Sequence, residues 1–189
     1  MKNILRVLLL APILLSAGCC ANDVCNCDDL FADALYFSFQ TSGPNAFTLA
    51  DVDTVYLLRY ASGSSVRPTD SAALVRSQNS TRPYTIRQQL TSKNLDVNTL
   101  VLSNTYPFAA GQTGKLSQHA YLLRVRLGDS RRNATYSYSI NNFRVSGHYR
   151  ADGCCTCYQN ETKSAFIRNQ YTDFTETAGA PVVVTLDKY

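Results

Sequence analysis

The chain has 189 residues, no tryptophan, twelve tyrosines and eight phenylalanines, and it carries a formal net charge of +4. Because basic and acidic residues are nearly balanced and no predicted face gathers the basic ones, a dedicated nucleic-acid binder is excluded. A chain of this length suits one domain with its own core, and the many aromatic and β-branched residues favour β-sheet.

The first eighteen residues have the three-part layout of a secretory signal. Lys2 and Arg6 form a positive start, an apolar run covers residues 7–15, and small residues follow at 16–18. The apolar run is too short to cross about 30 Å of hydrocarbon as a helix, so no permanent transmembrane anchor is expected. The predicted organisation is a signal peptide (1–18), a short polar tether (19–30) and a single domain (31–189).

The residues that end at Cys19 read LSAGC and resemble the bacterial lipobox. In that family the small residues admit the peptidase, and the cysteine thiol takes lipid such as palmitate and becomes the first residue. Cys19 is therefore the expected lipid attachment site, and Cys20 is a poorer cleavage point. The resemblance also implies sorting to the outer membrane, because the residue after the lipidated cysteine is not Asp. The alternative is an ordinary secretory signal that happens to end near a cysteine.

Short predicted strands alternate with turn-forming residues along the rest of the chain. The clearest pattern covers residues 121–149, where apolar and polar side chains alternate with the period of two of a half-buried strand. We interpret it as a three-stranded antiparallel meander, with Asn141 and Asn142 forming its second turn or a bulge. The expected strands are 35–39, 53–60, 84–87, 99–102, 121–127, 136–140, 143–149 and 181–186, with one helical turn over 87–93 as an alternative.

The absence of long amphipathic patterns in these segments favours one fold class. Short strands with turns between them predict an all-β, antiparallel β-sandwich, immunoglobulin- or transthyretin-like in its general architecture.

Six cysteines remain once Cys19 is assigned to lipid, and they form an early and a late cluster. An even number in an exported chain favours disulfides, because nothing in that compartment keeps thiols reduced. A bridge between the clusters would close a loop of about 130 residues, which the chain-entropy model values at about 4–5 kcal/mol. We expect Cys25 and Cys27 to pair with two of the later three cysteines. The disulfide candidates are Cys20, Cys25, Cys27, Cys154, Cys155 and Cys157.

The same cysteines allow a second interpretation, a thiolate site for Zn or Cu, both of which favour soft sulfur ligands. The spacings CxC and CCxC differ from the paired CxxC of zinc sites, and an oxidising compartment competes for the thiols, so disulfides are the preferred interpretation. The ligands in the alternative are Cys25, Cys27, Cys154, Cys157 and His148. No other cofactor is expected.

No catalytic motif is found in the sequence, because HExxH, GxSxG and a glycine-rich phosphate loop are all missing. We therefore expect a protein that is not an enzyme, with a hydrolase built from carboxylates on distant strands as the remaining alternative.

Taken whole, the chain resembles the small lipoproteins common in Bacteroidota, which have no assigned activity. The likeness rests on the lipobox, on residues 53–60 (DTVYLLRY), and on residues 138–143 (YSINNF) before the late cysteines. It implies an envelope protein anchored to membrane lipid through Cys19, with a binding or structural role. The expected partners, besides lipid, are another envelope protein or a glycan.

Overall fold

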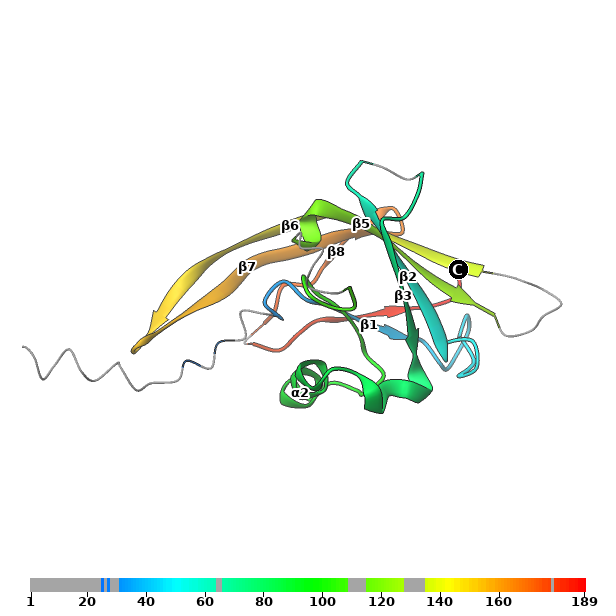
Figure 1. The fold of residues 1–189 in the computed structure, drawn as a ribbon, viewed down its shortest axis with the longest axis horizontal. Helices are drawn as coiled ribbons and strands as arrows, with labels where there is room; N and C mark the ends of the chain where they lie inside the picture. The colour runs from blue at the N-terminus through cyan, green and yellow to red at the C-terminus, as the bar shows by residue number, and fades with distance from the viewer. Residues whose placement is uncertain are drawn as a thin grey trace, which may run out of the picture.

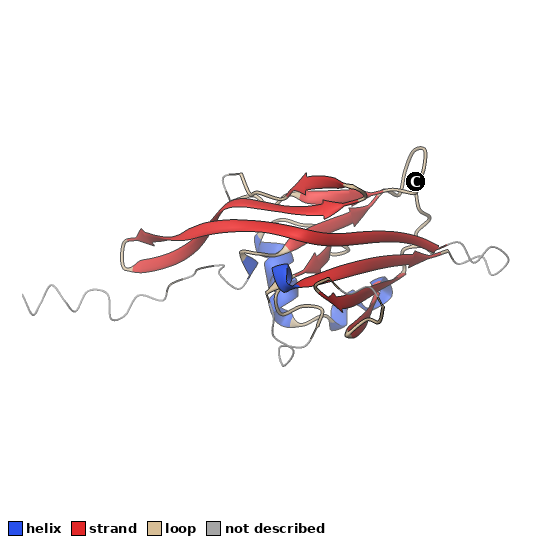
Figure 2. Ribbon diagram, turned by 90° about the horizontal axis from the view of Figure 1, so that it is seen from above, coloured by secondary structure: helices blue, strands red, loops and turns tan. Residues whose placement is uncertain are grey.

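The computed structural model is a sandwich of two β-sheets with a helix on its outer side (Figures 1 and 2). It describes residues 25, 27, 31–63, 66–108, 115–127, 135–177 and 179–189. The predicted signal peptide, Cys19 and Cys20 lie outside the described residues. The prediction of an all-β sandwich is confirmed, with the two sheets unequal in size.

The larger sheet is antiparallel and has the order β3-β2-β5-β6-β7-β8 among the described residues. Every second side chain of its central strands enters the core, as Leu57 and Leu123 do with no exposed surface. This is the alternation from which the sequence predicted these strands. The strands are β2 (Thr54–Ala61), β3 (Asp70–Val75), β5 (His119–Arg126), β6 (Thr135–Asp152), β7 (Cys155–Ile167) and β8 (Gln170–Asp173).

The smaller sheet has β1 (Leu35–Phe39) between β4 (Leu100–Leu102) and β9 (Val183–Leu186). β1 runs antiparallel to β4 but parallel to β9, so this one pair departs from the predicted antiparallel arrangement. Phe37 packs into the core between the sheets, whereas Tyr36 packs on the opposite face, and both are buried. Because the first part of β1 is covered on both faces, its first three residues, Leu35 to Phe37, are all large and apolar.

Helix α2 (Tyr84–Ser92) covers the outer face of the smaller sheet (Figure 1). Its buried residues Ile86, Gln89 and Leu90 follow the three- and four-residue spacing of one helix face. The strand predicted at 84–87 is therefore wrong, and the helical alternative is correct but longer than one turn. The chain also forms the short 3-10 helices η2 (Arg76–Thr81) and η3 (Leu116–Gln118).

β6 and β7 form a hairpin whose far part, residues 146–162, projects beyond the sandwich and is called the hairpin arm here (Figure 1, yellow and orange). The sequence predicted two strands where β6 is one. The register shifts between Asn141 and Arg144, and Asn142 has a φ of 48°. These residues form a β-bulge, which bends a strand without reversing it, so the predicted meander loses its second turn.

Gly147 marks a second register shift, at the base of the hairpin arm. A Cβ atom at this position would collide with the backbone carbonyl oxygen of Gln159 and lie 2.7 Å from the hydroxyl of Tyr158. We expect Gly147→Ala to open the arm locally, so that amide hydrogens within it exchange at least about tenfold faster in hydrogen-exchange measurements. Ser139→Ala, an exposed change on the same strand within the sandwich, is the control. Unchanged exchange in the arm would contradict the prediction.

Candidate functional site

The late cysteines lie at the tip of the hairpin arm. Gly153 makes the turn with a φ of 58°, a conformation that glycine adopts without strain, and β7 begins two residues later. Cys155 lies opposite Asp152, and Cys157 lies opposite Arg150. Since alternate residues of a strand point the same way, Cys155 and Cys157 lie on one side of β7.

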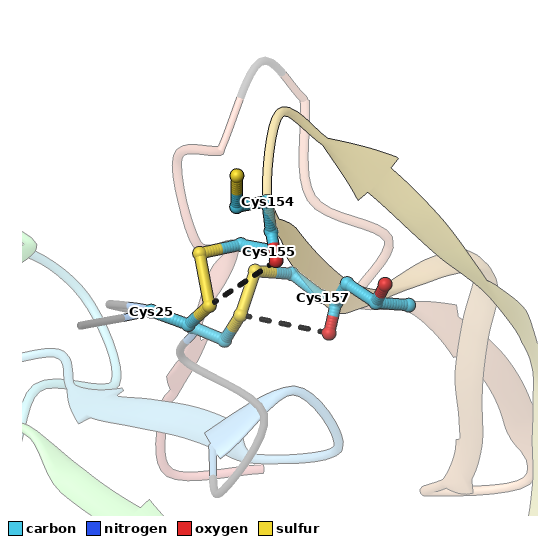
Figure 3. The surroundings of a disulfide bond; sticks show 6 residues. Cys25, Cys154, Cys155 and Cys157 are labelled. Atoms are coloured by element: carbon cyan, nitrogen blue, oxygen red, sulfur yellow. Dashed lines mark hydrogen bonds between the residues drawn. A yellow bond between two sulfur atoms is a disulfide. The ribbon is translucent and has the colours of Figure 1, made fainter. Parts of the chain in front are cut away.

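Two disulfides join this tip to the N-terminal segment, and together they are called the disulfide staple here (Figure 3). Cys25 pairs with Cys155 and Cys27 with Cys157, with Cα–Cα distances of 5.4 and 5.3 Å. Both bridges span 130 residues, so the two segments run in the same direction. Cys154 is disulfide-bonded as well. The predicted disulfide framework between early and late clusters is thus present.

β7 has a second edge, which faces away from β6. Within the described residues, no strand pairs with this edge before Ser164, where β8 begins to pair with β7. Instead, the side-chain amide of Asn160 donates a hydrogen bond to the carbonyl oxygen of Ala32. The staple and this contact hold Cys25, Cys27 and Ala32 against the hairpin.

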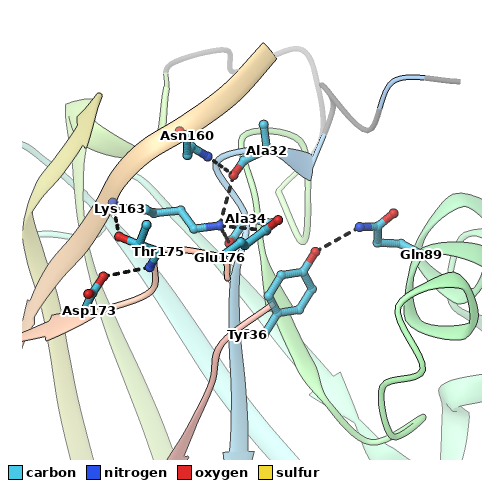
Figure 4. A network of polar contacts seen from close by, with 9 residues as sticks. All are labelled: Ala32, Ala34, Tyr36, Gln89, Asn160, Lys163, Asp173, Thr175 and Glu176. Carbon is cyan, nitrogen blue, oxygen red and sulfur yellow. Dashed lines mark hydrogen bonds and ion pairs between the residues drawn. The ribbon is translucent and has the colours of Figure 1, made fainter. Parts of the chain in front are cut away.

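Lys163, which follows Cys157 by six positions on β7, is the centre of a buried polar network (Figure 4). Its side chain is only 1% exposed, and Nζ donates hydrogen bonds to the carbonyl oxygens of Ala32 and Ala34, each at 3.0 Å. Nζ also lies 3.2 Å from Oε1 of Glu176. All three N–H donors of the ammonium group therefore have acceptors, which is the condition under which a buried charge is tolerated.

Burial lowers the pKa of the Lys163 amine, and the negative charge of Glu176 opposes that shift. The backbone N–H of Lys163 donates to Oγ1 of Thr175 at 2.9 Å, which fixes the strand beside Glu176. On the other side of β1, the amide of Gln89 donates to the Tyr36 hydroxyl at 3.1 Å. These contacts join β7, the N-terminal segment and α2 into one unit.

A cavity of about 490 Å³ lies between the staple and helix α2. Its wall is mostly polar and includes the bridge partners Cys27 and Cys157. It carries two cationic side chains, one carboxylate and several amides, so it offers both donors and acceptors of hydrogen bonds. The other side chains of its wall include Gln89, Lys93, Arg150, Tyr158, Asn160 and Glu176.

The structure does not assemble the alternative Zn or Cu site. Cys25, Cys27, Cys154 and Cys157 are all disulfide-bonded, and a bridged sulfur is not a thiolate ligand. His148 instead lies with Nδ1 2.9 Å from Oε1 of Glu161, on the exposed surface of the arm. No group of three or more potential metal ligands is found in the part of the chain that the structure describes.

Sequence reasoning missed Lys163 and Glu176. Lys163 follows a run of polar residues in which nothing marks it as buried, and Glu176 lies in a loop. Only the return of the N-terminal segment brings backbone carbonyls to the lysine. A lysine in a strand next to apolar Ala165 and Ile167 was the available signal, and it is a weak one.

Comparison with known protein families, curated proteins and solved structures finds no match to this chain. None of the described helices is long and apolar enough to cross a membrane. The fold and the site therefore define the class directly, as a two-sheet β-sandwich whose N-terminal segment is stapled by disulfides to the tip of a long hairpin.

Proposed function

We propose that this protein is an envelope lipoprotein, acylated at Cys19 and sorted to the outer membrane, with a binding or structural role rather than a catalytic one. The observation that carries the proposal is the disulfide staple, which begins at Cys25, immediately downstream of the lipobox-like segment. Disulfides of this kind persist in oxidising compartments outside the cytoplasm. A membrane tether joined covalently to the domain would hold it in one orientation.

The cysteine count supports different roles for Cys19 and Cys20. Cys25 and Cys27 pair with Cys155 and Cys157, so the partner of the bridged Cys154 must come from the remaining two cysteines of the chain. We assign that partner to Cys20, which leaves Cys19 as the single cysteine available for lipid.

The position of the staple also gives the anchored domain a direction. Cys25 lies six positions after Cys19, and an extended chain of that length reaches at most about 20 Å. The tip of the hairpin arm would thus lie next to the membrane surface. Each acyl methylene buried in the bilayer contributes about 0.8 kcal/mol, so several chains together hold the protein firmly.

The cavity beside the staple is the binding site in this proposal. Its amides and charged groups suit a ligand rich in hydroxyl groups, such as the glycan that the sequence suggests as a partner. Another envelope protein is the second partner class that this proposal includes.

Detergent phase partitioning of the protein expressed in a Gram-negative host with labelled palmitate tests the anchor. We expect the wild type to enter the detergent phase with label, and Cys19→Ala to stay in the aqueous phase without label. Cys20→Ala is the matched control, which should keep the lipid and expose one free thiol at Cys154 on thiol counting. An unlabelled wild type, or a labelled Cys19→Ala protein, would rule the proposal out.

A further inference from the structure

A second cavity, of about 260 Å³, opens between the two sheets and shares no wall residue with the cavity beside the staple. It lies where β1 ends and where β2 and β4 begin, and its inner wall is apolar. The apolar side chains are Phe39, Val52, Val55, Leu74 and Leu100.

Two arginines line the same cavity, and hydrogen bonds hold both in place. Arg76 donates from Nε to Oδ1 of Asn98 at 2.9 Å. Arg82 donates from Nη1 to the carbonyl oxygens of Val97 and Thr99, each at 3.0 Å. These bonds engage Nε of Arg76 and Nη1 of Arg82, so the two guanidinium groups are positioned by the protein before any ligand arrives.

The charges in this cavity do not cancel. Neither Arg76 nor Arg82 forms an ion pair with a carboxylate of the described residues. Asp96 also lines the cavity, and its Oδ1 accepts the backbone N–H of Asn98 at 2.6 Å. Two guanidinium groups and one carboxylate leave one net positive charge beside an apolar wall.

We propose that this cavity binds a small monocarboxylate with an apolar tail. The planar guanidinium fork matches the geometry of a carboxylate, and the apolar wall removes the tail from water. A ligand with one negative charge balances the lining, whereas Asp96 repels a dianion. The volume lies near the lower limit of ligand pockets, about 300 Å³, which restricts the ligand to a small molecule. This proposal does not depend on the lipid anchor.

Octanoate is the probe for this site. Binding is measured by calorimetry and by amide chemical shifts on residues 19–189 carrying Cys19→Ala, so that no acyl chain can enter the cavity. We expect octanoate to bind and to shift the amide signals of Leu74 and Leu100. The neutral octan-1-ol and the dianionic octyl phosphate should each bind at least about tenfold more weakly.

Charge variants then assign the site to its residues. Arg76→Gln should weaken octanoate binding about tenfold or more, and Asp96→Asn should strengthen it about two- to fivefold. Arg124→Gln makes the same change of charge at an exposed position of β5 and should leave the affinity unchanged.

Circular dichroism melting shows which of these proteins are folded, and Arg76→Lys replaces Arg76→Gln if the latter is not. Equal affinities of the Arg76 and Arg124 variants would overturn the proposal, and so would no octanoate binding or tighter binding of octyl phosphate.

Discussion

Replacing the three cysteines at the hairpin tip with serine is expected to lower the free energy of unfolding by about 4–5 kcal/mol. Each bridge of the staple closes a loop that spans 130 residues, and closure of so long a loop strongly restricts the unfolded chain. For a domain of this size, the melting temperature should fall by roughly 8–20 °C. The substitutions are Cys154→Ser, Cys155→Ser and Cys157→Ser.

The single substitutions test the same explanation. Cys157→Ser alone should lower the free energy of unfolding by much less than one third of the loss caused by the triple substitution. The reason is that the remaining bridges still close the long loop. Urea unfolding followed by circular dichroism measures these differences, and reductant should destabilise the wild type but not the triple variant. A triple variant with the stability of the wild type, or strictly additive single effects, would show that the bridges do not act by loop closure.

Replacing Lys163 with alanine is expected to cost about 3–5 kcal/mol of stability. The change removes the lysine's hydrogen bonds to the carbonyl oxygens of Ala32, which Asn160 also contacts, and of Ala34, and it leaves Glu176 without its partner. Lys163→Met keeps most of the packing volume but leaves the carbonyl oxygen of Ala34 without this donor, while Asn160 still donates to Ala32, so it should cost about 1–3 kcal/mol.

Glu176→Gln separates charge from hydrogen bonding in this network. The glutamine still offers an oxygen to Lys163 but no charge, and because Glu176 is 24% exposed, solvent reduces the effect to about 1 kcal/mol. Arg126→Ala, an exposed change on β5, is the control for loss of a cation. Thermal and urea unfolding measure all four variants. If Lys163→Met is as stable as the wild type, the ammonium group does not fasten the N-terminal segment.

Alternation of apolar and polar residues predicts the strands that have one face on the core. It locates β2 and β5 within one or two residues. A different signal locates β1 and β9, which are short, largely apolar runs bounded by turn residues. It fails for β7, whose residues in the hairpin arm are all at least partly exposed and therefore need no apolar alternation. The pattern also misses the edge strands β3 and β8, because few of their side chains reach the core.

Helix α2 shows how a weak helical pattern can be mistaken for a strand. Its nine residues carry two buried apolar side chains, Ile86 and Leu90, and a buried Gln89. A polar residue on the buried face weakens the helical pattern, and Tyr84 and Ile86 alone imitate the alternation of a strand. The hydrogen bond from Gln89 to Tyr36 explains why an amide is buried there, and it depends on a residue that is 53 positions away in sequence.

The sequence by itself determines the features of this protein that are local: the apolar alternation of strands, the lipobox-like segment before Cys19, and two cysteine clusters that an oxidising compartment would join. Only the tertiary structure decides which cysteines pair, that β9 runs parallel to β1, and that Lys163 is buried while Arg76 and Arg82 border a cavity. The physical reason is that these features depend on contacts between distant segments. Fifteen pairings of six cysteines satisfy the same sequence, and only the register of the N-terminal segment on β7 selects Cys25–Cys155 and Cys27–Cys157.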